Sequence, residues 1–315
     1  MSEKIDAIKS EIAKVVVGQE KMIDGLLIGL LCEGHILIEG IPGLAKTTTV
    51  KALSQSLGLG FKRVQFTPDL LPSDILGAEI YDPQNNAFKI KKGPIFTNLL
   101  LADEINRAPA KVQSALLEVM QERQVTIGDE SFKLELPFFV MATQNPVEQE
   151  GVYQLPEAQL DRFMLKLNVG YNSKEEELEI ARRIANEAAV TLTAAVSREE
   201  LEALKAEVKA VHIDEEVEHY MIELVAATRE PKAHGLDEVS DYIQFGASPR
   251  VSIDMFKAVK AMAYLRGKDY VTPVDVAYIA KELMRHRIVL TYEAEAEGVT
   301  TDEIIDKVLE AVAIP

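Results

Sequence analysis

Residues 40–47 restrict what this chain can fold into more than any other part of the sequence. They read Gly-Ile-Pro-Gly-Leu-Ala-Lys-Thr, which matches the phosphate-binding loop pattern G-x-x-x-x-G-K-[ST] except that Ala45 replaces the second glycine. A strand-like apolar run, residues 35–39, precedes the loop, and a helix-forming segment, residues 47–57, follows it. Such a loop needs a strand before it and a helix after it, so this stretch predicts a strand–loop–helix unit that binds a nucleotide.

The composition is that of a globular protein. Hydrophobic residues make up 47% of the 315 residues, which is enough for a sizeable core in one or two domains. Residues 1–20 carry several charges, and the longest apolar run, residues 26–32, is far shorter than the ~20 residues of a membrane span. The single cysteine, Cys32, cannot form a disulfide within the chain, so we expect a buried thiol. These features predict a cytoplasmic protein without a signal peptide or membrane span.

The charge balance narrows the class of ligand. The net charge is −17, from 51 acidic and 34 basic residues. This excess of negative charge repels the phosphate backbone of nucleic acids and argues against nonspecific binding to DNA or RNA. The histidines show no spacing typical of metal ligands, and no G-x-S-x-G nucleophile motif occurs. Nucleotide chemistry is therefore the best-supported reading.

Residues 36–170 alternate between strand-like runs and helical patterns. The runs are residues 36–39, 61–66, 99–102, 138–142 and 163–167. This alternation is typical of a parallel sheet covered by helices on both faces. We therefore predict an α/β nucleotide-binding domain over residues 1–172.

After Gly170 the sequence carries helix-start signals instead of strand patterns. They are capping boxes at residues 173–176 and 197–200 and the pairs Ser248-Pro249 and Thr272-Pro273, in which a cap residue precedes a proline. These signals predict a smaller, all-helical domain over residues 173–315.

Two hairpins interrupt the α/β pattern. Residues 77–94 contain a turn rich in Asp, Pro and Asn between alternating segments, and residues 125–136 turn at Gly128-Asp129. From the residues alone, two explanations are equally good for each hairpin: it is a plain surface loop, or it has a function.

An acidic pair follows the run at residues 99–102. Hydrolases with a phosphate-binding loop need an aspartate at the end of a strand to hold the water shell of the metal, and Asp103 fits that place. Its neighbour Glu104 can polarise an attacking water as a general base. The alternative is a strand that simply ends in exposed acids.

An amide stands at the end of the next predicted strand. Asn145 follows residues 138–142, and the carboxyl ends of parallel strands form the ligand-binding edge of such a sheet. There the amide can orient water and sense the terminal phosphate. An Asn-Pro turn would be an equally good plain loop, but together with the loop and the acidic pair Asn145 becomes a candidate sensor.

Taken together, these motifs resemble the MoxR family of AAA+ ATPases, in which alanine before the lysine is usual. The motifs are the loop at residues 40–48, Asp-Glu-Ile-Asn-Arg-Ala-Pro at 103–109 with the segment 111–118, Ala-Thr-Gln-Asn-Pro at 142–146, and Leu-Pro-Glu-Ala-Gln-Leu-Asp-Arg-Phe at 155–163. The resemblance is dense from about residue 15 to residue 169 and thinner beyond, where residues 247–250 are the main anchor.

The resemblance implies a ring, with six subunits expected, in which ATP lies between neighbours. Arg162 matches an arginine finger that reaches the adjacent subunit, and Arg250 matches a second sensor whose subunit of action is left open; Arg107 is also a candidate interface residue. The expected nucleotide-binding residues are Val17, Gly18, Gln19, Gly40, Pro42, Gly43, Leu44, Ala45, Lys46, Thr47, Thr48 and Asp103. The expected catalytic residues are Glu104, Asn145, Arg162 and Arg250, with Mg²⁺ held by Thr47 and, through water, by Asp103.

The resemblance also implies work on other proteins. Members of the family act as chaperone-like motors in the maturation of enzyme complexes or metal insertion, and their usual partners carry von Willebrand factor A domains. Both hairpins resemble insertions that face the central pore or a partner.

Two other functions stay open at this point. A nucleic-acid motor or metal-chelatase-like subunit would suit the lysines at 89, 91 and 92, although the other hairpin is acidic. A scaffold that binds ATP and hardly hydrolyses it is the other possibility. It would not need Glu104, Asn145 and Arg162, so the presence of these residues speaks against it.

Overall fold

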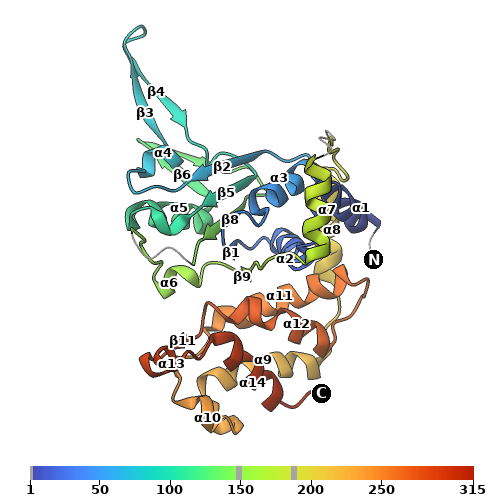
Figure 1. The fold of residues 1–315 in the computed structure, drawn as a ribbon. Coiled ribbons are helices and arrows are strands. Elements are labelled where there is room, and N and C mark those ends of the chain that lie inside the picture. Colours follow the sequence, from blue (N-terminus) through green and yellow to red (C-terminus); the bar gives the residue numbers. More distant parts are fainter. Residues whose placement is uncertain (1–2, 147–150, 186–189) are drawn as a thin grey trace.

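The computed structural model describes residues 3–146, 151–185 and 190–315, and it contains an α/β part and a helical part (Figure 1). The central sheet consists of β1 (Ile36–Glu39), β2 (Phe61–Gln65), β5 (Leu99–Asp103), β8 (Phe139–Gln144) and β9 (Leu165–Asn168). Its order is β2-β5-β8-β1-β9, and every neighbouring pair is parallel. The predicted parallel sheet is confirmed, with strand ends shifted by one or two residues.

The three inner strands, β5, β8 and β1, form because their side chains are buried on both faces of the sheet. Leu99, Leu100 and Leu101 are all 0% exposed, as expected for a covered parallel strand. In β1, Ile36 belongs to one apolar cluster and Leu37 to another, because successive side chains point to opposite faces. The helices of this part are α1 (Glu3–Ala13), α2 (Glu20–Leu31), α3 (Lys46–Ser56), α4 (Pro72–Leu76), α5 (Ala110–Glu122) and α6 (Glu157–Leu160), with a 3-10 turn η1 (Ile105–Arg107).

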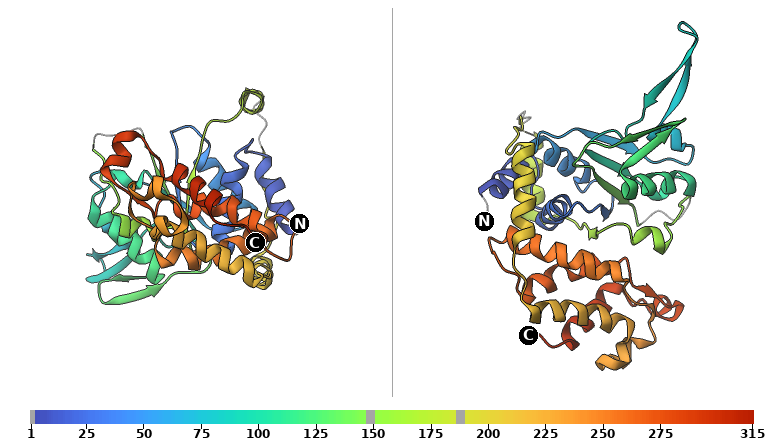
Figure 2. Two further views of the ribbon diagram at one scale, coloured as in Figure 1. Left: turned by 90° about the horizontal axis from the view of Figure 1, so that it is seen from below. Right: turned by 180° about the vertical axis from the view of Figure 1, so that it is seen from behind.

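Both predicted hairpins are present. Strands β3 (Gly77–Asp82) and β4 (Ala87–Lys92) pair along their whole length, and Figures 1 and 2 show them projecting far from the body of the molecule. Strands β6 (Gln124–Ile127) and β7 (Glu130–Lys133) form the second hairpin. The ammonium of Lys92 lies 4.9 Å from the ring centre of Phe96 and 4.8 Å from that of Phe132, and this contact joins the bases of the two hairpins.

The rest of the chain is helical apart from one short strand pair. Its helices are α7 (Lys174–Ala185), α8 (Arg198–Ala210), α9 (Glu215–Arg229), α10 (Asp237–Ser240), α11 (Pro249–Leu265), α12 (Pro273–Met284), α13 (Tyr292–Glu297) and α14 (Thr301–Ala311), with a 3-10 turn η2 (Pro231–His234). Strands β10 (Ile243–Phe245) and β11 (Val289–Leu290) pair antiparallel and are too short to leave a periodic pattern in the sequence. No helix among the described residues is long and apolar enough to cross a membrane.

The helical part packs directly on the α/β part. Helix α11 contacts α2, and α12 contacts the edge strand β9, so that one apolar cluster runs through both parts. Helix α8 also contacts α2, and the guanidinium of Arg183 in α7 donates to the carbonyl of Ala13 at 2.8 Å. The boundary at residues 172 and 173 stays a prediction, while the packing shows that α8 contacts both parts and that α7 contacts the α/β part.

His35, just before β1, makes the stability of the α/β part depend on pH. Its Nδ1 accepts a hydrogen bond from the Val140 N–H at 3.0 Å, so Nε2 carries the single proton and donates to the Met120 carbonyl at 3.0 Å. This arrangement suits neutral imidazole, and burial lowers the pKa of His35 from 6.5 to about 4.

Because only the unfolded chain takes up this proton between pH 6.5 and 4, we expect the free energy of unfolding to fall as the pH drops through that window. The part due to His35 should reach about 3 kcal/mol at the acid end. Urea unfolding across this range measures how steeply the free energy of unfolding falls with pH. This fall should be equally steep in the wild type and in a His219→Asn control, and shallower in His35→Asn. Equal slopes for His35→Asn and the wild type would contradict this account.

Candidate nucleotide-binding site

The loop between β1 and α3 keeps the backbone geometry of a phosphate-binding loop despite its alanine. Ala45 has φ 56° and ψ 16°, in the left-handed region, and caps α3. An L-residue with a side chain adopts this conformation at a cost of roughly 1–2 kcal/mol, whereas glycine does so freely. The sequence leaves two alternatives for this position, a right-handed residue or a strained loop, and the structure has the strained one.

The first residue of the loop lies against the segment that follows β9. A Cβ on Gly40 would stand 2.7 Å from the carbonyl oxygen of Val169, so no side chain fits there. Close beside this contact, the Gln19 amide donates to the Gly170 carbonyl at 3.1 Å, and the Asn172 amide donates to the Val17 carbonyl at 2.9 Å. The predicted residues 17–19 therefore adjoin the phosphate-binding loop.

The loop carries a half-buried ammonium at the start of α3. Lys46 Nζ donates to the Gly40 carbonyl at 2.6 Å, across the loop. Burial lowers the pKa of Lys46, and the nearby carboxylates of Asp103, Glu104 and Glu39 act in the opposite direction. The free N–H groups of the first turn of α3 add the positive end of a helix dipole, so the loop is built to receive an anion.

The acidic pair lies on the same edge of the sheet as the loop, because β1 and β5 run parallel. Asp103 Oδ1 accepts from the Thr143 hydroxyl at 2.6 Å, and its Oδ2 accepts from Arg63 Nε at 2.9 Å. Glu104 has a left-handed backbone (φ 56°). Its N–H donates to the Thr143 hydroxyl at 2.9 Å, and its Oε2 accepts from the Gln65 amide at 2.6 Å. Each carboxylate is therefore held in a fixed direction.

Three residues of this network were not among the predicted site residues. Thr143 joins the two acids, Arg63 pairs with Asp103, and Gln65 holds Glu104. A polar residue at the end of a strand is a signal for such a role, but only the order of the strands places β2 beside β5.

Asn145 also belongs to this edge. It follows β8, whose last carbonyl, that of Gln144, accepts from the Gly40 N–H at 3.3 Å. The side chain is 7% exposed, so it is buried next to the start of the loop. The structure thus brings together the loop, the acidic pair and the candidate sensor.

Arg162 and Arg250 lie at the opposite edge of the sheet. Arg162 stands between α6 and β9 and donates to the Leu117 carbonyl at 3.0 Å; two residues later, the Met164 N–H donates to the His35 carbonyl at the amino end of β1. Arg250, in the first turn of α11, pairs with Asp161 at 3.1 Å. Strand β1, with four residues, spans about 13 Å. The length of the strands therefore separates the two arginines, at the amino ends, from the loop at the carboxyl ends.

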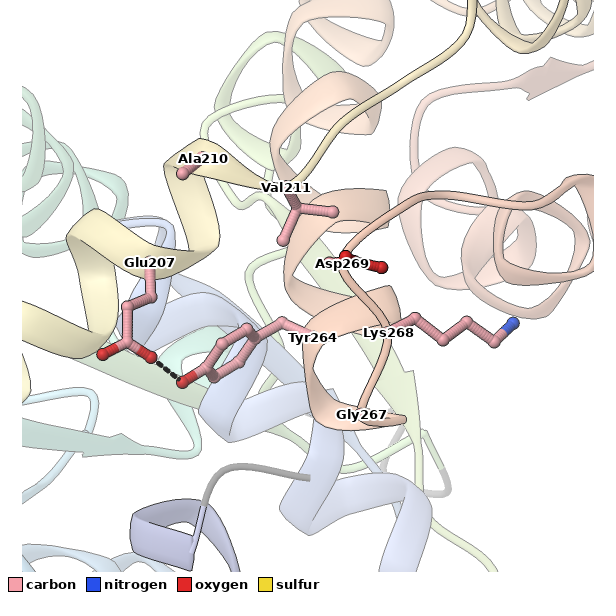
Figure 3. A pocket seen from close by; sticks show the side chains of 7 residues that line it. All are labelled: Glu207, Ala210, Val211, Tyr264, Gly267, Lys268 and Asp269. Atoms are coloured by element: carbon pink, nitrogen blue, oxygen red, sulfur yellow. Dashed lines mark hydrogen bonds between the residues drawn. The ribbon is translucent and has the colours of Figure 1, made fainter.

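The two arginines line a cavity of about 360 Å³ that Cys32 also borders. Cys32 is partly buried, where the sequence predicted a buried thiol; the thiol donates to the Lys257 carbonyl at 3.4 Å, and desolvation raises the pKa of Cys32 to about 12. A larger cavity, of about 660 Å³, lies on the helical part between Glu207 and Asp269 and contains none of the predicted site residues (Figure 3). Cavity size therefore does not indicate the site in this molecule.

Comparison with known proteins places this arrangement in a family. Residues 35–165 match the ATPase family associated with various cellular activities (AAA), and residues 237–308 match the AAA lid domain. The chain is 47% identical to chaperone MoxR1 of Mycobacterium tuberculosis, over 97% of this chain and 81% of that protein. It is 31% identical to protein MoxR of Paracoccus denitrificans, over 96% of this chain and 93% of that protein.

A solved structure agrees with the sequence comparisons. The crystal structure of a protein from Cytophaga hutchinsonii superposes with a TM-score of 0.94 and 52% identity, covering 99% of this chain and 95% of that chain. The fold, the order of the motifs and the nearly full-length similarity agree, and the chain belongs to the MoxR family of AAA+ ATPases.

Proposed function

We propose that this protein hydrolyses ATP at a site shared between two copies in a ring, with six subunits expected, and uses the energy to remodel protein partners as a chaperone. The observation that carries this proposal is the position of the arginines. Arg162 and Arg250 lie across the sheet from Lys46 and the acidic pair, so they can serve the phosphates only of a neighbouring copy. A head-to-tail interface forms a ring when the rotation from one copy to the next closes, and the proposal is that it closes here.

In this proposal the loop edge binds the nucleotide. The loop N–H groups and Lys46 contact the phosphates, and residues 17–19 adjoin the base. The Thr47 hydroxyl and the Asp103 carboxylate are oxygen donors of the type that Mg²⁺ prefers, and they would hold it, Asp103 through water. When bound, Mg²⁺ neutralises charge on the phosphates.

Glu104 takes the role of general base. Its carboxylate accepts a proton as water attacks the γ-phosphorus, the bond to the leaving ADP oxygen breaks, and Asn145 orients the water. The neighbour's Arg162 and Arg250 stabilise the charge on the transferred phosphoryl group. The hydrogen bonds from Gln65 and to Thr143 keep Glu104 in place for this step.

The projecting hairpin is the candidate contact with clients. Phe88 is 69% exposed, Tyr81 49% and Ile80 47%, and apolar side chains of this kind suit protein partners, among them von Willebrand factor A domains. Of the basic residues that would favour a nucleic acid, Lys89 is paired with Asp82 and Lys92 is stacked on two rings. If added DNA stimulated hydrolysis, the nucleic-acid motor would replace the chaperone.

The variant Glu104→Gln tests the role of the base. It should bind ATP like the wild type and lower kcat by about 10²-fold or more, because the amide cannot accept the proton. Steady-state phosphate release and titration with ATP measure the two effects, and Glu310→Gln, at an exposed site in α14, is the control. If Glu104→Gln hydrolysed ATP normally, this role would be wrong. Loaded with ATP, the same variant is also a suitable bait for identifying clients.

A further inference from the structure

One carboxylate connects the two arginines. Asp161 immediately precedes Arg162 in the chain, and its Oδ2 pairs with Arg250 Nη1 at 3.1 Å. Its Oδ1 accepts from the Ser248 hydroxyl at 2.9 Å, and Ser248 is the residue that caps α11. The direction of this carboxylate therefore sets where the start of α11 lies relative to the segment that carries Arg162.

A buried arginine, Arg287, forms an ion pair with the Asp161 carboxylate. The Arg287 side chain is 1% exposed, and its Nε forms an ion pair with Asp161 Oδ1 at 2.9 Å without the geometry of a hydrogen bond. Its Nη2 donates to the Asp161 carbonyl at 3.1 Å and to Asp254 Oδ2 at 2.6 Å. The same guanidinium donates from Nη1 to the carbonyls of Met164 and Leu283 at 3.4 and 3.3 Å.

The geometry of these contacts requires a planar, multiply donating cation. Arg287 joins the segment just before β9, α11 and the end of α12 through one rigid fork, whereas an ammonium is a point charge that cannot span the two carboxylates in the same way. Removing a buried partner leaves the remaining charges uncompensated, so Asp161 would no longer be fixed.

We infer that Arg287 is a positioning residue that, through Asp161, keeps Arg162 and Arg250 in a single arrangement for the neighbouring subunit's ATP. The inference rests on the proposed function, because both arginines must act on a neighbour for their common position to matter. Arg287 touches neither the loop nor the acidic pair, so it acts on the face that a subunit offers to its neighbour.

The neighbouring Arg285 provides a matched control. It also ties the end of α12 to β9, donating to the Lys166 carbonyl at 2.9 Å and pairing with Asp302 at 2.8 Å. Within the part of the chain that the structure describes, neither its hydrogen bonds nor its ion pairs include Asp161. A general loss of docking between the two parts would therefore affect Arg285→Lys and Arg287→Lys alike, whereas a loss of positioning would affect Arg287→Lys alone.

The test measures kcat and KM for ATP in both variants. We expect Arg287→Lys to lower kcat roughly 10- to 100-fold with KM little changed, since a small misplacement of a catalytic group costs about that much. Arg285→Lys should stay close to the wild type. When Arg287→Lys is mixed with Glu104→Gln subunits, activity should return, because the loop edge of the first then meets an intact arginine face of the second.

Three results would overturn the inference. They are a normal kcat for Arg287→Lys, an equal loss in Arg285→Lys, and a loss that mixing does not repair although an Arg162→Ala protein is repaired in the same way. If Arg162→Ala is not repaired either, the shared site itself is wrong, and the inference fails with it. Should Arg287→Lys not fold, Asp254→Asn, which weakens the other anchor of Arg287, must show the same repairable loss of kcat.

Discussion

Replacing Lys46 by alanine is expected to raise the dissociation constant for ATP at least about 100-fold, which corresponds to about 3 kcal/mol. The ammonium is half-buried at the start of α3 and is the charged group that the loop offers to the phosphates. Isothermal titration calorimetry of the purified protein with ATP measures this loss of affinity directly.

The control for this variant is Lys51→Ala, on an exposed face of the same helix. It removes an equal charge from α3 but not from the loop, so it should bind ATP like the wild type. Equal affinities for Lys46→Ala and Lys51→Ala would mean that residues 40–47 are not the phosphate-binding loop of this protein.

Replacing Arg162 by alanine is expected to lower kcat about 10³-fold or more while ATP still binds. A guanidinium that stabilises the charge of the transferred phosphoryl group is worth roughly 10³–10⁵ in rate in related phosphoryl-transfer reactions. ATP binding should survive because Arg162 lies across the sheet from the loop of its own subunit. Phosphate release measures kcat, and Arg198→Ala, an exposed arginine paired with Glu135, is the control.

Local pattern is enough to predict much of this site. A strand, a glycine-rich loop and a helix follow one another in residues 35–57, and the acids at 103 and 104 end an apolar run, so each motif can be read within a short window. Both hairpins were predictable for the same reason, since alternation and turn residues act over a few positions.

What could not be predicted depends on how distant segments meet. The hydrogen bond from Gln65 to Glu104 joins residues 39 apart, and it requires β2 to lie beside β5, which no local pattern determines. Likewise, Arg250 meets Asp161, 89 residues earlier in the chain, because the helical part packs on the α/β part. The left-handed backbone of Ala45 is a third case, since sequence alone allows either a right-handed residue or strain.

The packing of the helical part bears on whether Arg250 acts within its own subunit or on a neighbour, which the resemblance leaves open. Arg250 borders the same cavity as Arg162, at the amino ends of the strands, so one subunit presents both arginines on one face. This placement favours action on a neighbour for both residues and not for Arg162 alone.

The most direct test of a shared site is to mix Arg162→Ala with Glu104→Gln subunits in equal amounts. Each variant alone should be nearly inactive, because one lacks the arginine offered to the neighbour and the other lacks the base. In random head-to-tail rings, about a quarter of the interfaces would pair the intact loop edge of the first with the intact arginine of the second. We therefore predict that the mixture hydrolyses ATP at up to about a quarter of the wild-type rate. A mixture that forms mixed rings yet stays as inactive as its components would contradict the account.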